Sequence, residues 1–211
     1  MNTFRISDTV DAERFDEIVS GLRSFLDMLC SHQADAVFCG DIKIFCESLV
    51  AGQSGELSAA GARLAPGSWC VSPSIEGMPS DARVDYIFVP TYLAVSILVK
   101  VKTCQPDIAL GIPRFEDSLR AGLDFAALRK FMGHGYDAMS GLFEAAEIMH
   151  AGGVFEFARD NPYVSPAFCS AVSKTKADLE ARLASGDVSD GFDQRDVSAG
   201  MRRALRQISA S

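Results

Sequence analysis

Residues 84–103 read VDYIFVPTYLAVSILVKVKT, and the conformation of this stretch decides the fold class. Residues 86–89 favour a strand, and residues 99–102 alternate between apolar and charged side chains. Pro90, however, suits the first turn of a helix, and residues 91–99 are apolar on nearly every side. We therefore predict a buried helix that starts near Pro90. The alternative is a pair of central strands, which would make the fold α/β, because periodicity alone cannot resolve a short apolar run.

Outside this stretch, apolar residues recur mostly with helical spacing. The first helix has one broad apolar stripe, formed by Phe15, Ile18, Val19, Leu22, Phe25, Leu26 and Leu29. The same spacing predicts helices at 10–30, from Asp35 or Asp41 to Val50, and at 113–132, 137–151, 154–159 and 166–184. We therefore predict a mostly α fold of stacked helical hairpins around one core.

Several helix ends have their own sequence signals. Ser165-Pro166 combines a capping hydroxyl with a proline suited to the first helical position. Pro113 is expected to open the 113–132 helix in the same way. Glycines 152, 153 and 186 are expected to end the helices that precede them.

Residues 52–84 form a loop-rich insertion in this helical pattern. Glycine, proline and serine are frequent there, and Trp69 is the only tryptophan of the chain. A structureless loop of this length is unusual inside a compact domain. We expect either a segment folded over the surface and anchored by Trp69, or a partly mobile lid.

The sequence predicts one helical domain at 1–185, a polar linker at 186–195 and an amphipathic C-terminal helix at 196–211. The apolar face of this last helix consists of Val197, Met201, Leu205 and Ile208, and its other side carries Arg202, Arg203 and Arg206. We expect it to dock on the acidic body of the protein or on a second copy. Binding to a membrane surface or to a partner protein is the alternative.

The composition is that of an acidic globular protein. The 211 residues are 48% hydrophobic and 23% charged, with a formal net charge of -8. This balance argues against nucleic acid as a partner, because phosphate backbones are bound through lysine and arginine. No uncharged apolar run reaches the roughly 18 residues of a membrane helix, and the N-terminus lacks signal-peptide character. We expect a soluble, cytoplasmic protein that binds neither nucleic acid nor membrane.

No pattern of ligands indicates a metal or a cofactor. The six cysteines form no Cys-x-x-Cys pair. Glu147 and His150 have the Glu-x-x-His spacing of di-metal helices, but the second copy that such sites need is missing. His32 lies near Cys30 and Cys39 without a fourth ligand. Because nucleotide-binding and hydrolase motifs are also absent, we predict no metal and no cofactor, and the sequence identifies no reaction.

The most distinctive string is Gly133-His134-Gly135-Tyr136-Asp137, between two predicted helices. Two flanking glycines would expose the imidazole of His134, which could act as an acid, a base or a ligand. Tyr136 adds a rigid amphipathic contact and Asp137 a carboxylate. The alternative is structural: Gly133 ends one helix, Asp137 caps the next, and His134 is an exposed turn residue.

Residues 85–157 resemble the alternating inner and outer helices of α/α-toroid proteins, the class that includes terpenoid cyclases and protein prenyltransferases. The acidic catalytic motifs of the cyclases are not matched, so the resemblance implies no activity. It implies a geometry in which Asp85, Tyr86 and Tyr92 lie at the same end of the molecule as His134 and its neighbours.

Two functions are compatible with these features. The first is a helical module that mediates protein–protein contacts or self-association, through the C-terminal helix. The second is a small-molecule enzyme or binding protein with a pocket near the turn at 133–137, lined by His134, Tyr136 and Asp137. The absence of catalytic motifs favours the first.

Overall fold

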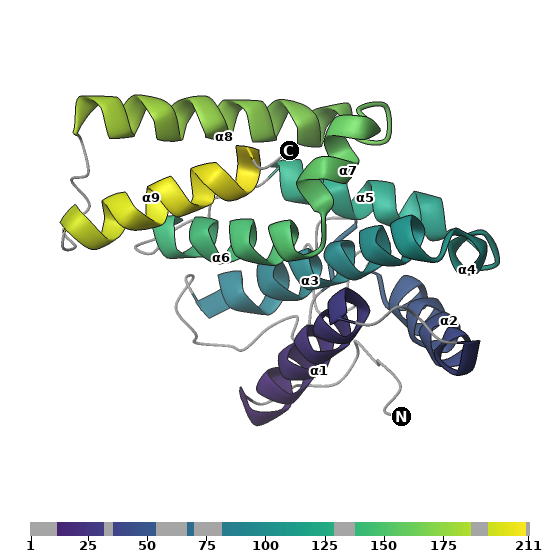
Figure 1. Cartoon of the computed structure of the whole chain (residues 1–211). Helices are drawn as coiled ribbons and strands as arrows, with labels where there is room; N and C mark the ends of the chain where they lie inside the picture. The colour runs from purple at the N-terminus through teal and green to yellow at the C-terminus, as the bar shows by residue number, and fades with distance from the viewer. Residues whose placement is uncertain are drawn as a thin grey trace, which may run out of the picture.

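The computed structural model describes residues 12–31, 36–53, 67–69, 82–128, 138–186 and 194–209, which fold into packed α-helices without a β-strand (Figure 1). The helices are α1 (Ala12–Ser31), α2 (Ala36–Ala51), α3 (Ala82–Cys104), α4 (Pro106–Leu110), α5 (Phe115–Leu128), α6 (Ala138–Ala151), α7 (Val154–Asp160), α8 (Pro166–Ser185) and α9 (Gln194–Ser209). The predicted mostly α fold is confirmed. The α/β alternative is wrong, because residues 82–104 form a single helix.

Helix α3 is the centre of the packing. Every side chain from Phe88 to Val99 is buried, and α1, α4, α5, α6 and α7 all contact this helix. Figure 1 shows α6 on one side of α3 and α1 on the other. A helix covered on all sides needs apolar residues on all sides, which is why its sequence has no amphipathic period. Neither α3 nor any other helix in the described ranges is long and apolar enough to cross a membrane.

The start of α3 differs from the predicted one. The helix begins at Ala82, and Pro90 lies inside it rather than in its first turn. An interior proline removes one backbone hydrogen bond and crowds the preceding turn, which normally ends or kinks a helix. Here Pro90 is itself buried, as are Phe88 and Val89 before it. Packing on both sides of the proline therefore outweighs its local preference.

A short piece of the 52–84 insertion is part of the core. Trp69 is only 1% exposed. Its indole Nε1 donates a hydrogen bond of 2.8 Å to the carbonyl oxygen of Leu49, and its backbone N–H donates one of 2.9 Å to Oγ1 of Thr91. The predicted anchoring by Trp69 is confirmed, and it joins this segment to α2 and α3. The other residues between Gln53 and Ala82 lie outside the described part of the chain.

Two further contacts hold the same segment against α5. Nε2 of Gln53 donates to the carbonyl oxygens of Gly67 and Ser118, at 3.0 and 2.8 Å. Gly67 has a φ of +91°, and a Cβ built at this position would lie 2.2 Å from the carbonyl oxygen of Ala121. Only glycine fits both the backbone conformation and this close approach.

The region before α5 also departs from the prediction. The sequence indicated a helix that opens at Pro113, whereas α4 occupies residues 106–110 and α5 begins at Phe115. Arg114 has a φ of +63°, a left-handed conformation that an α-helix cannot include. Pro106 is the first residue of α4, so this proline, and not Pro113, opens a helix. Pro113 thus lies in the turn between two helices.

The predicted ends of the later helices agree with the structure. Oγ of Ser165 accepts a hydrogen bond of 3.1 Å from the N–H of Phe168 and caps α8, with Pro166 directly after it. The same hydroxyl donates to Oδ1 of Asp124 at 2.6 Å, which joins α8 to α5. Gly186 follows α8 in the left-handed conformation typical of a helix stop.

Candidate functional site

The turn that the sequence singled out, at residues 133–137, separates α5 from α6 in the sequence. His134, Tyr136 and Asp137 lie in the gap between α5 and α6, outside the described residues. A pocket at this turn, and the toroid-like arrangement of helices around it, stay predictions.

The three other candidates for ligand binding belong to α3. At Asp85 and Tyr86 the structure describes the backbone alone. Tyr92 is 3% exposed, and its ring stacks on Phe88, with ring centroids 6.0 Å apart. Phe88 in turn stacks on Phe125 of α5 at 5.7 Å. Tyr92 is thus a buried residue whose ring packs on a neighbour in its own helix, and that neighbour contacts α5.

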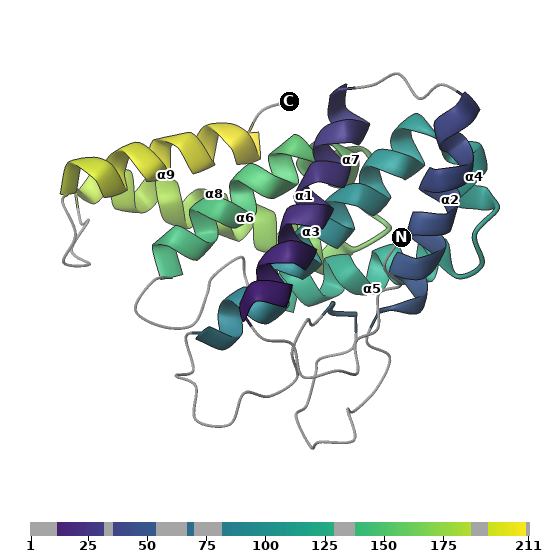
Figure 2. The same cartoon turned by 90° about the horizontal axis from the view of Figure 1, so that it is seen from below.

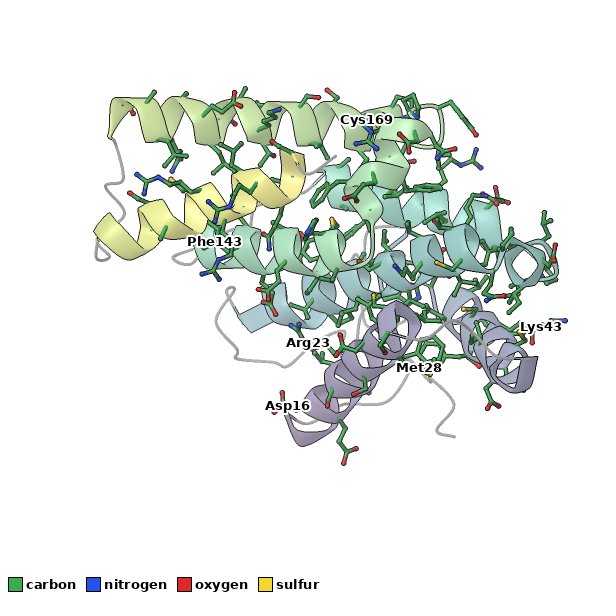
Figure 3. All side chains as sticks on the ribbon, in the orientation of Figure 1. Asp16, Arg23, Met28, Lys43, Phe143 and Cys169 are labelled. Carbon is green, nitrogen blue, oxygen red and sulfur yellow. The ribbon has the colours of Figure 1, made fainter. Side chains whose placement is uncertain are left out.

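Helix α9 offers a more informative surface, and its two faces have different surroundings. The apolar face packs against α6 and α8 (Figures 1 and 2). Its buried residues are Val197, Met201, Ala204 and Ile208. A Cβ at Gly200 would lie 2.3 Å from Cε2 of Phe143, so the backbone of α9 touches the ring that Figure 3 labels on α6. Docking on the body of the protein, one of the predicted outcomes, is therefore confirmed.

The opposite face of α9 is cationic. Arg202, Arg203 and Arg206 are exposed, and none of them forms an ion pair with a residue in the described ranges. Arg202 and Arg206 are four residues apart and share one side of the helix, with Arg203 next to them. Other arginines do have carboxylate partners: Arg23 pairs with Glu144, Arg120 with Asp117 and Arg159 with Asp160.

We call Arg202, Arg203 and Arg206 the arginine face. A guanidinium presents a planar fork of N–H donors that matches a carboxylate or a phosphate. Burial of the apolar side fixes the backbone beneath this face. The face can therefore bind anionic groups without a change in the fold.

A second polar cluster lies where α6 meets α7. Nδ1 of His150 is 3.9 Å from Oε1 of Glu156. Nδ1 of His150 and Oε2 of Glu156 are both buried, and neither has a hydrogen-bond partner among the residues that the structure describes. The imidazole of His150 and the carboxylate of Glu156 thus face each other across the junction of α6 and α7. The sequence did not predict this contact, since the two side chains belong to different helices.

A thiol lies beside the same junction. Sγ of Cys30 donates a hydrogen bond of 3.2 Å to the carbonyl oxygen of Ala151. Burial raises the pKa of the Cys30 thiol, Lys100 counteracts this, and Asp27 and Cys104 raise it further. A thiol that stays protonated is a poor nucleophile and a poor metal ligand. Within the described ranges, no group of three or more His, Cys, Asp or Glu side chains is arranged to hold a metal ion. The junction thus supports a function less well than the arginine face does.

No known protein family matches the chain, and neither the curated proteins nor the solved structures contain a match.

Proposed function

We propose that this protein is a helical association module whose arginine face binds a carboxylate-rich surface of another protein molecule. The observation that carries the proposal is the difference between the two sides of α9. Its apolar side is buried against α6 and α8, while its three arginines are exposed without a described partner.

The chemistry of the face favours carboxylates over other anions. The protein has a formal net charge of -8, which repels the dense negative charge of nucleic acid at long range. Insertion into a membrane would need an apolar helix face, and that of α9 is covered by the protein itself. A protein surface with a few carboxylates has a much lower density of negative charge than a phosphate backbone, needs no apolar helix face, and suits the bidentate geometry of arginine.

The expected affinity is modest. An exposed ion pair contributes about 0.2–1 kcal/mol, so three of them give weak and reversible binding. Salt weakens such pairs, because the screening length falls from about 10 Å at 0.1 M to about 3 Å at 1 M. The contact should therefore respond strongly to ionic strength.

Fluorescence anisotropy with a labelled glutamate-rich peptide tests the proposal. We expect the wild-type protein to bind this peptide in low salt and to release it in high salt. The triple variant Arg202→Glu, Arg203→Glu, Arg206→Glu should lose at least about tenfold in affinity, the effect of about 1.4 kcal/mol.

The matched control reverses three cations elsewhere, Lys43, Arg120 and Lys174, which are all exposed. It changes the net charge by the same amount and should keep most of the binding. Equal loss in both variants would mean that only net charge matters, and would overturn the proposal. So would tighter binding to duplex DNA than to the peptide.

A further inference from the structure

The surface of α1 that faces away from the body is the acidic counterpart of the arginine face. Asp16, Glu17 and Asp27 are exposed and form no ion pair with a described residue. Asp16 and Asp27 are eleven residues apart, which places them about 16 Å from each other along the helix. We call these three residues the acidic face.

Small residues lie between the carboxylates. Ser20 and Ser24 continue the stripe from Asp16 to Asp27 at steps of four and three, and Gly21 lies beside them; all three are exposed. The distance at which two helices can pack depends on the side chains between them. Because these side chains are short, another helix can approach α1 closely and extend long arginine side chains towards its carboxylates.

Within one molecule the two faces do not meet. Helix α9 packs on α6 and α8, whereas the buried side of α1 packs on α3. Figures 1 and 2 show α9 at one end of the molecule and α1 beside α3, away from that end. Figure 3 shows Asp16 on the outer side of α1. A contact between the faces therefore needs two molecules.

We infer that the acidic surface bound by the arginine face is the acidic face of a second copy of this chain. The inference rests on the proposed function and names its partner. The two faces differ, so the contact runs head to tail, and a pair of copies joined by one contact still has one arginine face and one acidic face free. Association then continues to higher oligomers unless a ring closes.

Two copies of this chain carry the same acidic net charge, so the attraction between them is confined to the place where the arginine face meets the acidic face. Opposite patches on molecules of like net charge attract only at short range, and the general repulsion opposes them. We therefore expect oligomers at high protein concentration and moderate ionic strength. They should dissociate in high salt, where the ion pairs themselves are screened.

Sedimentation velocity with two charge-reversed variants tests this. One reverses the arginine face (Arg202→Glu, Arg203→Glu, Arg206→Glu), and the other reverses the acidic face (Asp16→Lys, Glu17→Lys, Asp27→Lys). Each variant alone should sediment as a monomer, because it presents two faces of like charge. An equimolar mixture should associate again, since the glutamates of one variant meet the lysines of the other.

Net charge cannot produce this rescue. Three reversals change the formal charge of -8 by six units, so both variants remain negatively charged and repel each other at long range. The variant that reverses Lys43, Arg120 and Lys174 keeps both faces and should associate like the wild type. Circular dichroism establishes that each variant is folded.

The inference is overturned if the wild type is monomeric at every salt concentration, or if the mixture of folded variants stays monomeric. The peptide titration separates this from failure of the proposed function. If the glutamate-rich peptide still binds through the three arginines while the wild type is monomeric, the partner is a different protein. If peptide binding does not depend on the arginines either, both proposals are wrong.

Discussion

Replacement of Trp69 measures how much the short segment at 67–69 contributes to the core. The side chain is 1% exposed, its indole Nε1 donates to the carbonyl oxygen of Leu49 in α2, and its ring lies close to Gly122 of α5. Trp69→Ala removes a large buried ring and leaves a cavity, which costs about 3–5 kcal/mol. In a domain of this size each kcal/mol lowers Tm by about 2–4 °C, so the variant should melt about 10 °C below the wild type.

The conservative replacement Trp69→Phe separates packing from hydrogen bonding. It keeps an aromatic ring and removes the bond of 2.8 Å to the carbonyl oxygen of Leu49. An orphaned buried acceptor costs about 1–3 kcal/mol. This oxygen also accepts a bond of 3.2 Å from the N–H of Gly52, so it keeps one donor. We therefore expect Trp69→Phe to lower the free energy of unfolding by about 1 kcal/mol, the lower end of that range.

Urea unfolding followed by far-UV circular dichroism gives both free energies. Tyr163→Ala is the control, because this ring is 77% exposed and its loss should cost less than about 0.5 kcal/mol. Since Trp69 is the only tryptophan, its fluorescence should also resist quenching by acrylamide until the protein unfolds. A Trp69→Ala variant as stable as Tyr163→Ala would refute the placement of this segment in the core.

Three further predictions address other contacts. Gly200→Val should weaken the docking of α9, because a Cβ at this position would lie 2.3 Å from the ring of Phe143. Limited proteolysis should therefore cleave the C-terminal helix faster than in the wild type, and an unchanged rate of cleavage would contradict the contact. Ser165→Ala should lower the free energy of unfolding in urea by about 1–2 kcal/mol, because α8 loses its cap and the hydrogen bond to Asp124 is removed. A decrease below about 0.5 kcal/mol would show that the cap contributes little. Burial raises the pKa of Cys46 to about 12, so its thiol stays protonated at pH 8. We therefore expect Cys46 to react with a disulfide reagent at this pH only after the protein unfolds. If Cys46 is among the thiols that react in the native protein, the core opens readily.

Helical periodicity was sufficient for the elements that have one apolar side. The two ends of α8 could be predicted because the signals there are local. Ser165 supplies a capping hydroxyl, Pro166 has no N–H that would be left without a partner, and Gly186 adopts the left-handed conformation. Such signals depend on a few neighbouring residues. They can be interpreted without knowledge of the tertiary structure.

Residues 82–114 could not be assigned fully in this way. A helix buried on all sides loses its amphipathic period, and Pro90 remains inside α3 because packing holds both sides of it. The positive φ of Arg114, which separates α4 from α5, has no glycine to signal it. Both features follow from tertiary packing, which one sequence does not reveal.

The candidate sites also differ in how far the sequence alone could predict them. The arginines of α9 and the apolar stripe opposite them follow from helical spacing, but the sequence left open whether the stripe docks on this molecule or on another. The contact of His150 with Glu156 joins two helices, so no spacing rule predicts it. A site formed by one helix face is thus predictable, and one formed where helices meet is not.

Arginine side-chain NMR tests the central claim most directly, because each Nε–Hε group gives its own signal. On addition of the glutamate-rich peptide, the signals of Arg202, Arg203 and Arg206 should shift together and return in high salt, while that of Arg120, already paired with Asp117, should stay in place. Shifts of equal size at Arg120, or none at the three arginines of α9, would contradict the claim that this face binds carboxylates.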